Sequence, residues 1–257
     1  MLKFRNVNIL FASVGLILLA LTWIFSISLI ILIPLIVIYL LLVAYGTTVL
    51  SAQFFVDVRS GGNNSSNAIA ITFDDGPVPG KTEKILDILH SHKIPAAFFC
   101  IGNRVAANPE LAKRIYKAGH LLGNHSYWHR NTFDLQSSKK IEQELRDTND
   151  VIEGCVGVRP AYFRPPYGVT NPMVASAINH GGYKTVGWTV RSFDTISKDP
   201  KSLLRRVTKS LKSGDIVLFH DYCDITREIL PEFLEKVASS GLKIVRVDQL
   251  LNEKAYV

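Results

Sequence analysis

A long uncharged stretch near the N-terminus constrains this chain more than any other feature. No Asp, Glu, Lys or Arg occurs between Asn6 and Val56, whereas charged residues appear at ordinary density from Asp57 onward. Within the stretch, Asn8–Phe25 and Ser28–Tyr45 are apolar runs of about 18 residues each, close to the roughly 20 residues that a helix needs to cross a bilayer. We therefore predict that residues 1–50 form a transmembrane region of two helices in a tight hairpin.

A long apolar region at an N-terminus can also take two other forms. A cleaved signal peptide has an apolar core of only about 7–15 residues, so this region is much too long for one. One long tilted span followed by an interfacial piece is the remaining alternative. Lys3 and Arg5 favour a cytoplasmic N-terminus. Two crossings would return the large domain to the cytoplasmic side and one crossing would place it outside. The sequence therefore predicts a multi-pass protein of a bacterial cytoplasmic membrane but leaves the side of the large domain open.

The remainder of the chain divides into a short linker and one domain. Residues 51–67 contain the polar stretch SGGNNSSN, which is typical of a flexible linker or surface loop. Residues 68–257 are enough for one domain with a proper core. Lys3 and Arg5 carry two of the seven net positive charges, and no basic run with interleaved aromatic residues occurs in the rest. That pattern argues against nucleic-acid binding.

The three cysteines give no support to a disulfide framework. Cys100, Cys155 and Cys223 form no CxxC pair, and their number is odd. Cys100 lies in the apolar run AAFFCIG, which predicts a buried core thiol.

From Ala68 onward, short apolar runs alternate with amphipathic helical patterns. The expected strands are Ala68–Phe73, Ala96–Ile101, His120–Gly123, Ala161–Phe163, Lys184–Trp188, Ile216–Phe219 and Leu242–Val245. The expected helices are Lys81–His92, Pro109–Ala118, Lys139–Gly154, Pro172–His180, Lys201–Lys212, Thr226–Ser239 and a short last one within Val247–Asn252. Such repetition predicts an α/β fold with a parallel sheet and helices outside. Neither GxGxxG nor GxxxxGK[ST] follows the first strand, so nucleotide-binding folds lose support. About seven strand–helix units fit a barrel, complete or incomplete, better than a small open sheet.

Unusual polar residues come directly after several expected strands. Asp74 and Asp75 follow the first strand, His125 the third, Arg164 the fourth and His220 the sixth. Loops at the carboxyl ends of barrel strands form one face of the fold, where active sites lie. We therefore expect these side chains to converge in one pocket.

Two of these motifs suggest a metal centre. In Thr72-Phe-Asp-Asp-Gly76, one of the two adjacent carboxylates can bind a metal while the other exchanges a proton. An ordinary Asp-Gly turn after a strand would have the same sequence. In His125-Ser-Tyr-Trp-His129, the two histidines at i and i+4 would share one face of a helical turn. Two His and one Asp make a three-ligand site with open positions, which is typical of catalysis.

Two further motifs suggest groups that act around such a centre. Arg164-Pro-Pro-Tyr-Gly168 is a rigid loop that can aim a backbone N–H at a developing oxyanion, and Arg164 can hold a carboxylate ionised. In Leu218-Phe-His220-Asp221, a histidine at a strand end can serve as a general acid near neutral pH.

Together, TFDDG, HSYWH, RPPYG and LFHD resemble the motifs of the polysaccharide deacetylases of carbohydrate esterase family 4, which share the NodB homology domain. The four occur in the order of that family and span about Ala68 to Leu251. The resemblance implies a distorted (β/α) barrel and a metal-dependent deacetylase.

The resemblance also implies roles for individual residues. Asp74 would be the general base, and Arg164 would position it. Asp75, His125 and His129 would bind a divalent metal, expected to be Zn²⁺. The remaining roles would be an oxyanion-binding N–H at Tyr167, a general acid at His220 and a wall of the acetyl pocket at Leu218.

One stretch departs from the family pattern, in which two acids often lie near a tryptophan. This chain reads Trp188-Thr-Val-Arg-Ser-Phe-Asp194, so that Arg191 stands at the first acid position. Asp194 matches the second and would support His220. We expect Trp188 and Arg191 to line the substrate pocket and a basic Arg191 to suit an anionic substrate.

These observations predict a hydrolase of non-peptide carbon–nitrogen bonds that removes N-acetyl groups from peptidoglycan or another N-acetylhexosamine glycan. The alternatives are a deformylase, a deacetylase of a lipid-linked sugar at the membrane, and a non-catalytic glycan-binding membrane protein. The expected partners are the glycan and the lipid bilayer, and the sequence does not indicate an oligomeric state.

Overall fold

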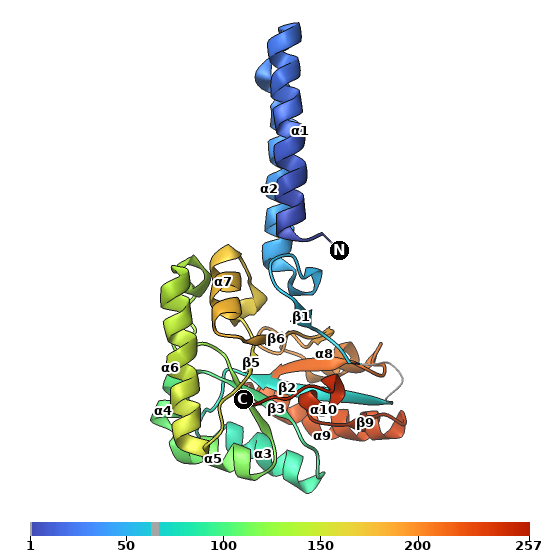
Figure 1. Cartoon of the computed structure of the whole chain (residues 1–257). Coiled ribbons are helices and arrows are strands. Elements are labelled where there is room, and N and C mark those ends of the chain that lie inside the picture. The colour runs from blue at the N-terminus through green and yellow to red at the C-terminus, as the bar shows by residue number, and fades with distance from the viewer. Residues whose placement is uncertain (1, 63–66) are drawn as a thin grey trace.

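The computed structural model describes residues 2–62 and 67–257. A helical hairpin projects like a stalk from a rounded α/β domain (Figure 1). The hairpin consists of α1 (Phe4–Phe25), a short 3-10 turn (Leu29–Ile31) and α2 (Leu32–Thr48). The chain reverses at Ser26, which takes a left-handed conformation with φ 50°. The expected pair of helices is therefore present.

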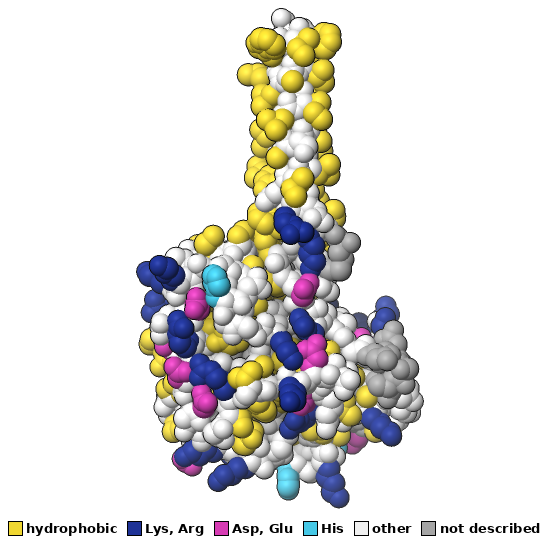
Figure 2. Space-filling view, in the orientation of Figure 1, with side chains coloured by type: hydrophobic (Ala, Val, Ile, Leu, Met, Phe, Trp, Pro, Cys, Tyr) yellow, Lys and Arg dark blue, Asp and Glu magenta, His cyan; other side chains and the backbone are white. Residues whose placement is uncertain are grey.

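Both helices are long and apolar enough to cross a membrane. The two candidate spans are Phe4–Phe25 and Leu29–Thr48. Only 11% and 6% of their most apolar 18-residue segments are buried. Their outer faces are covered with exposed apolar side chains (Figure 2). A core helix of a water-soluble protein would bury such a surface, whereas the apolar faces of this hairpin are exposed.

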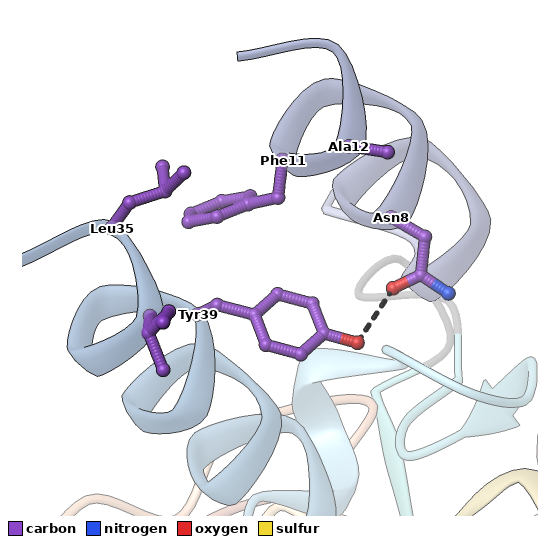
Figure 3. Close-up of a pocket in the computed structure, with 6 residues that line it drawn as sticks. Asn8, Phe11, Ala12, Leu35 and Tyr39 are labelled. Atoms are coloured by element: carbon purple, nitrogen blue, oxygen red, sulfur yellow. Dashed lines mark hydrogen bonds between the residues drawn. The ribbon is translucent and has the colours of Figure 1, made fainter. Parts of the chain in front are cut away.

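The two helices are joined by a contact between polar side chains. The Tyr39 hydroxyl donates a hydrogen bond of 2.9 Å to Asn8 Oδ1, and the Tyr39 ring lies 5.4 Å from that of Phe11 (Figure 3). This bond satisfies polar atoms that an apolar environment would otherwise leave unpaired. A shallow hollow of about 300 Å³ lies beside it. It is lined by Asn8, Phe11, Ala12, Leu35, Ile36 and Tyr39.

The base of the hairpin is attached to the domain. The Phe4 N–H donates to the Phe54 carbonyl at 2.9 Å, and Lys3 pairs with Asp57. Leu50, in a 3-10 turn (Leu50–Ala52), is buried in the same apolar cluster as Val174.

The segment 51–67 is not a free linker throughout. It contains β1 (Val58–Arg59), which pairs with β6, and Phe54, Val56 and Val58 are buried. The polar composition around residue 61 suggested a loop, but the apolar residues before it bury their side chains and hold the chain against the sheet. The part of the expected linker at 63–66 lies outside the described residues.

The other strands are β2 (Ala68–Asp74), β3 (Ala97–Cys100), β4 (Leu121–Asn124), β5 (Tyr162–Phe163), β6 (Lys184–Val186), β7 (Val190–Arg191), β8 (Ile216–His220) and β9 (Lys243–Ile244). All their ladder pairings are parallel, in the order β1-β6-β5-β4-β3-β2-β8-β7, with β9 beside β2. Only residues 187–189 separate β6 from β7, so the hydrogen-bonded path curls round on itself through this bent segment. The expected distorted (β/α) barrel is confirmed, with β1 and β7 as short additions to the predicted strands.

Helices pack around this curled sheet (Figure 1). They are α3 (Thr82–Ser91), α4 (Gly102–Ala107), α5 (Pro109–Lys117), α6 (Ser138–Val156), α7 (Pro172–His180), α8 (Pro200–Thr208), α9 (Asp224–Ser239) and α10 (Val247–Leu251). Short 3-10 turns lie at Phe133–Leu135 and Pro166–Gly168.

The alternation of side chains along β2 explains where the polar groups go. Ile69, Ile71 and Phe73 belong to a cluster packed under the surrounding helices, whereas Ala68 and Ala70 belong to the cluster inside the sheet. Because side chains alternate along a strand, Thr72 and Asp74 continue the inner row. The last residue of β2 therefore turns its carboxylate into the mouth of the barrel.

Candidate active site

Asp75, His125 and His129 form a compact cluster at the carboxyl ends of the strands. Asp75 Oδ1 lies 3.4 Å from His125 Nε2 and 3.3 Å from His129 Nε2, and the three ligand atoms all lie within 4.8 Å of one another. Asp75 itself takes a positive φ of 74°.

The two histidines do not converge on a helical turn as predicted. Residues 125–130 form an irregular loop in which Ser126 and His129 have φ values of 62° and 50°. The Asn124 side chain accepts a hydrogen bond from Ser126 N–H at 3.0 Å and stabilises this loop. Side-chain hydrogen bonds of this kind offer the backbone an alternative to the helix, which the i, i+4 spacing did not reveal.

The cluster fits a divalent cation. Asp75 Oδ1 is buried and has no hydrogen-bond partner among the described residues. His125 Nδ1 bonds to the Arg164 carbonyl at 2.7 Å, which requires the proton on Nδ1 and leaves the Nε2 lone pair directed at Asp75. Burial and the neighbouring His125 lower the pKa of His129 to about 4, so its imidazole is neutral at physiological pH. Two imidazole nitrogens and one carboxylate oxygen are ligand types that hold divalent metal ions in proteins.

Beside the cluster, Asp74 is held by a buried arginine. Arg164 Nη1 donates to Asp74 Oδ1 at 2.7 Å and to Thr72 Oγ1 at 2.8 Å. The guanidinium also donates to two carbonyls at the end of β6, those of Val186 and Gly187. Arg164 is fully buried, and its bond to Asp74 fixes the orientation of that carboxylate. Asp74 thus presents its second carboxylate oxygen at a defined place.

A second pair, His220 and Asp194, lies on the β8 side of the same mouth. His220 Nδ1 and Asp194 Oδ1 are 2.7 Å apart, and Asp194 Oδ2 accepts bonds from the His220 N–H and the Thr226 hydroxyl. Burial alone would lower the pKa of His220, but the hydrogen bond and negative charge of Asp194 raise it above the ordinary value. The raised pKa keeps His220 protonated to higher pH, with Nε2 free to donate.

This pair predicts a shift in pH dependence. An Asp194→Asn substitution removes the charge that raises the pKa of His220, so the imidazolium should lose its proton at lower pH. If His220 is the general acid, the alkaline limb of the pH profile of kcat should move to lower pH. The acid limb, set by another group, should stay in place. The measurement is kcat against pH for both proteins, and an unmoved alkaline limb would contradict the prediction.

The loop after β5 presents a backbone N–H to the pocket. Tyr167 lies in the turn Pro166–Gly168 with φ 60° and ψ −1°, and its ring is 4.8 Å from that of His129. Its N–H has no backbone acceptor among the described residues, unlike that of Gly168, which bonds to the Pro165 carbonyl. An unused N–H beside a metal cluster is available to a developing oxyanion.

Gly168 makes this turn possible, and its replacement should be costly. It has φ 74°, and a Cβ there would lie 2.5 Å from the Trp188 ring. We expect Gly168→Ala to lower kcat/KM about tenfold or more, since displacing positioned groups by an ångström costs on that order or above. Gly157→Ala is the matched control, because Gly157 has φ 77° with no atom within 4 Å of the added Cβ. Equal losses of activity in both variants, with equal changes in Tm, would show that backbone strain alone is responsible.

All of the predicted residues except Arg164 and Asp194 line one cavity of about 240 Å³. It is lined by Asp74, Asp75, His125, His129, Pro165, Tyr167, Gly168, Trp188, Arg191, Thr195, Leu218, His220 and Tyr222. Arg164 and Asp194 do not line it but lie behind Asp74 and His220. Trp188 was expected to end a strand; instead it lies in the bend between β6 and β7.

Sequence reasoning missed several residues of this region. Tyr222 and Thr195 line the cavity, and Arg104 of α4 donates to the Asp75 carbonyl at 2.6 Å.

Asp221 was also missed. It is buried, accepts a bond of 2.6 Å from the Thr82 hydroxyl, and has a pKa raised by burial to about 7. A Cβ at Gly76 would lie 2.1 Å from this carboxylate, so Asp221 packs directly against the Asp-Gly turn. Its place after His220 was the only available signal.

Comparisons with known proteins identify the family of the chain. The polysaccharide deacetylase family model matches residues 61–186. The peptidoglycan-N-acetylglucosamine deacetylase of Bacillus cereus is 38% identical over 196 residues, covering 74% of this chain and 91% of the relative. The chain belongs to the polysaccharide deacetylase family. PgdA of Listeria monocytogenes, also a peptidoglycan-N-acetylglucosamine deacetylase, is 34% identical over 193 residues, covering 75% of this chain and 41% of that longer protein.

Solved structures of the family share the fold. The Bc1960 peptidoglycan N-acetylglucosamine deacetylase superposes with a TM-score of 0.72 at 25% identity, covering 77% of this chain and 94% of the other. BA3943 of Bacillus anthracis, described as a pseudoenzyme of the same esterase family, gives a TM-score of 0.71 at 31% identity, covering 77% and 70%. The fold alone therefore does not guarantee catalysis, and the side chains of the site have to carry the argument.

Proposed function

We propose that this polysaccharide deacetylase is a metal-dependent enzyme, anchored in a membrane by its hairpin, that removes N-acetyl groups from an N-acetylhexosamine glycan of the cell wall, in the first place peptidoglycan. The observation that carries the proposal is that one small cavity brings together the Asp75–His125–His129 cluster, the Asp74–Arg164 pair and the His220–Asp194 pair.

The cluster would hold the metal through Asp75 Oδ1, His125 Nε2 and His129 Nε2. Bound Zn²⁺ supplies Lewis acidity, which polarises a carbonyl and lowers the pKa of a coordinated water. The buried, unpartnered oxygen of Asp75 and the free lone pair of His125 are the features of this chain that fit such an ion.

The other groups divide the proton transfers of amide hydrolysis. Asp74, held in orientation by Arg164, accepts the proton of the attacking water. The Tyr167 N–H donates to the oxygen of the tetrahedral intermediate, where negative charge develops. His220, held protonated by Asp194, donates a proton to the departing sugar amine. Acetate and a free amino sugar are the products.

Leu218, Trp188 and Arg191 bound the space in which the acetylated sugar lies. Leu218, an inner residue of β8, offers an apolar surface to the acetyl methyl. The Trp188 indole can stack on the apolar face of a sugar ring, because aromatic side chains provide large flat surfaces.

Acetate release is the direct test. The full-length chain in detergent, stripped of metal and then given Zn²⁺, should release acetate from N-acetylglucosamine oligomers and from peptidoglycan, and the stripped protein should not. Formate release from N-formyl sugars would favour the deformylase. Acetate release from a lipid-linked N-acetylated sugar, but not from polymers, would favour a deacetylase of a lipid-linked sugar at the membrane. Zinc binding with no release from any substrate would favour a glycan-binding protein.

The membrane part of the proposal rests on the exposed apolar hairpin. Both of its helices are long and apolar enough to cross a membrane, and no protein covers their outer faces among the described residues. Two crossings would place the N-terminus and the domain on the same side. Extraction of cell membranes at alkaline pH should leave the protein in the membrane pellet, and protease protection of the domain would report its side.

A further inference from the structure

A basic and aromatic surface runs from the catalytic pocket to a neighbouring hollow. Arg191 Cζ lies 5.5 Å from the Trp188 ring centroid and 4.9 Å from that of Phe193. Arg206, on α8, places its Cζ 5.3 Å from the same Phe193 ring. Trp188 and Arg191 line the catalytic pocket, whereas Phe193 and Arg206 line a separate hollow of about 550 Å³. The Phe193 ring therefore joins the two spaces.

The Phe193 backbone is held in a conformation that a large side chain rarely adopts. Its φ is 59°, and its side chain remains 37% exposed rather than buried. Conformations of this kind cost free energy and cluster at sites that hold ligands. Ile196, 74% exposed, adds a second apolar side chain to the same hollow.

The two guanidinium groups lack anionic partners. Each Cζ lies about 5 Å from one ring centroid, so Arg191 and Arg206 are no more than about 10 Å apart. Both are exposed, and neither forms an ion pair within the described part of the chain. Two like charges held around one ring repel each other, and an anion between them would remove that repulsion.

The nearby carboxylates do not serve as that anion. Asp194 is buried and is bonded to His220 and Thr226. Asp199 lines the hollow, but its carboxylate accepts the N–H groups of Lys201 and Ser202 and so caps α8. Lys198, which also lines the hollow, adds a further positive charge.

We propose that this surface is a subsite for an acidic sugar next to the acetylated sugar that is cleaved, with a carboxylate or phosphate held by Arg191 and Arg206. Guanidinium groups bind both anions in bidentate geometry, and the Trp188 and Phe193 rings can pack against the apolar faces of successive sugars. The inference rests on the proposed function and narrows its substrate to an anionic glycan, with the acetamido sugar in the catalytic pocket and the acidic sugar over Phe193.

The test compares three soluble oligomers of equal length on the zinc-loaded full-length chain. One is neutral N-acetylglucosamine, one carries lactyl carboxylates on alternate sugars, and one carries phosphate esters. The variants are Arg206→Gln and Arg191→Gln. The matched control is Arg205→Gln, which removes an exposed charge from the same helix without a contact to Phe193. The readouts are kcat/KM for each oligomer and its affinity by tryptophan fluorescence.

We expect the native protein to prefer an acidic oligomer. Arg206→Gln and Arg191→Gln should each reduce the ratio of kcat/KM for the acidic over the neutral oligomer about tenfold, mainly through KM, as expected for one lost charge-assisted contact. Arg205→Gln should leave that ratio unchanged. Preference for the carboxylated or the phosphorylated oligomer would identify the source of the anion.

An unchanged ratio in both variants, or an equal fall in Arg205→Gln, would overturn the subsite. Hydrolysis of the neutral oligomer in that case would leave the proposed function standing. Absence of acetate release from all three oligomers would count against the proposed function, and the fluorescence affinities would still decide whether the acidic oligomer binds through Arg206.

Discussion

An Asp74→Asn substitution should lower kcat for acetate release by about a thousandfold, within the range that a general base contributes. The amide keeps the shape of the carboxylate and can still accept the bond from Arg164 Nη1, but it cannot take a proton from water. The ligand atoms of Asp75, His125 and His129 stay in place, so zinc content should remain at the native level. Tm should fall, because the buried Arg164 charge loses its anionic partner.

The matched control is Asp87→Asn, an exposed carboxylate on α3 that pairs with Arg114. It should change neither kcat nor zinc content. Retention of more than about a tenth of the native kcat by Asp74→Asn would contradict the assignment of Asp74 as the base, since even a modest base contributes about a hundredfold.

Removing a ligand should have an equally large effect through metal content. A His125→Ala substitution deletes the Nε2 atom that lies 3.4 Å from Asp75 Oδ1 and leaves two ligands. We expect zinc affinity to fall by more than about a hundredfold, since even changes behind the ligands cost 10–100-fold. Activity should fall with it and return only in part at high zinc concentration.

The measurements are bound zinc per chain after dialysis and acetate release against free zinc. His180→Ala, a change of an exposed histidine on α7, is the control and should retain native zinc and activity. Native zinc content in the His125→Ala protein would show that His125 is not a metal ligand. Native activity in a zinc-free protein would overturn metal dependence itself.

The barrel and the set of pocket residues follow closely from the sequence because they depend on strong local patterns. The apolar run Ala68–Phe73 needed no tertiary information to be identified as a strand, and the carboxyl ends of parallel strands must lie on one face. Asp74, Asp75, His125 and His220 therefore had to lie near one another once the strands were located. Their chemical roles remain proposals that the substitutions above test.

Features that depend on backbone detail were not predictable in this way. The strands β1 and β7 contain two residues each, too few to show a period. The strands β5 and β9 are as short, but they lie within the apolar runs Ala161–Phe163 and Leu242–Val245 that were predicted as strands. The loop around His129 and the turn at Phe193 use positive φ at residues other than glycine, for which the sequence carries no clear signal. The meeting of Phe193 with Arg206, thirteen positions apart in the sequence numbering, depends on that turn and became visible only in the structure.

The contact between the hairpin and the loop after β5 has a consequence for how the enzyme meets its substrate. The Thr170 N–H donates to the Thr47 carbonyl, in the last turn of α2, at 3.1 Å. Tyr167 is three residues away, and three extended residues span at most about 11 Å. With α2 embedded as proposed, the reaction takes place at a nearly constant height above the bilayer. The rate at which the active site meets its substrate then depends on the number of acetylated sugars per unit area in a thin layer along the membrane. Their concentration in the surrounding volume matters less.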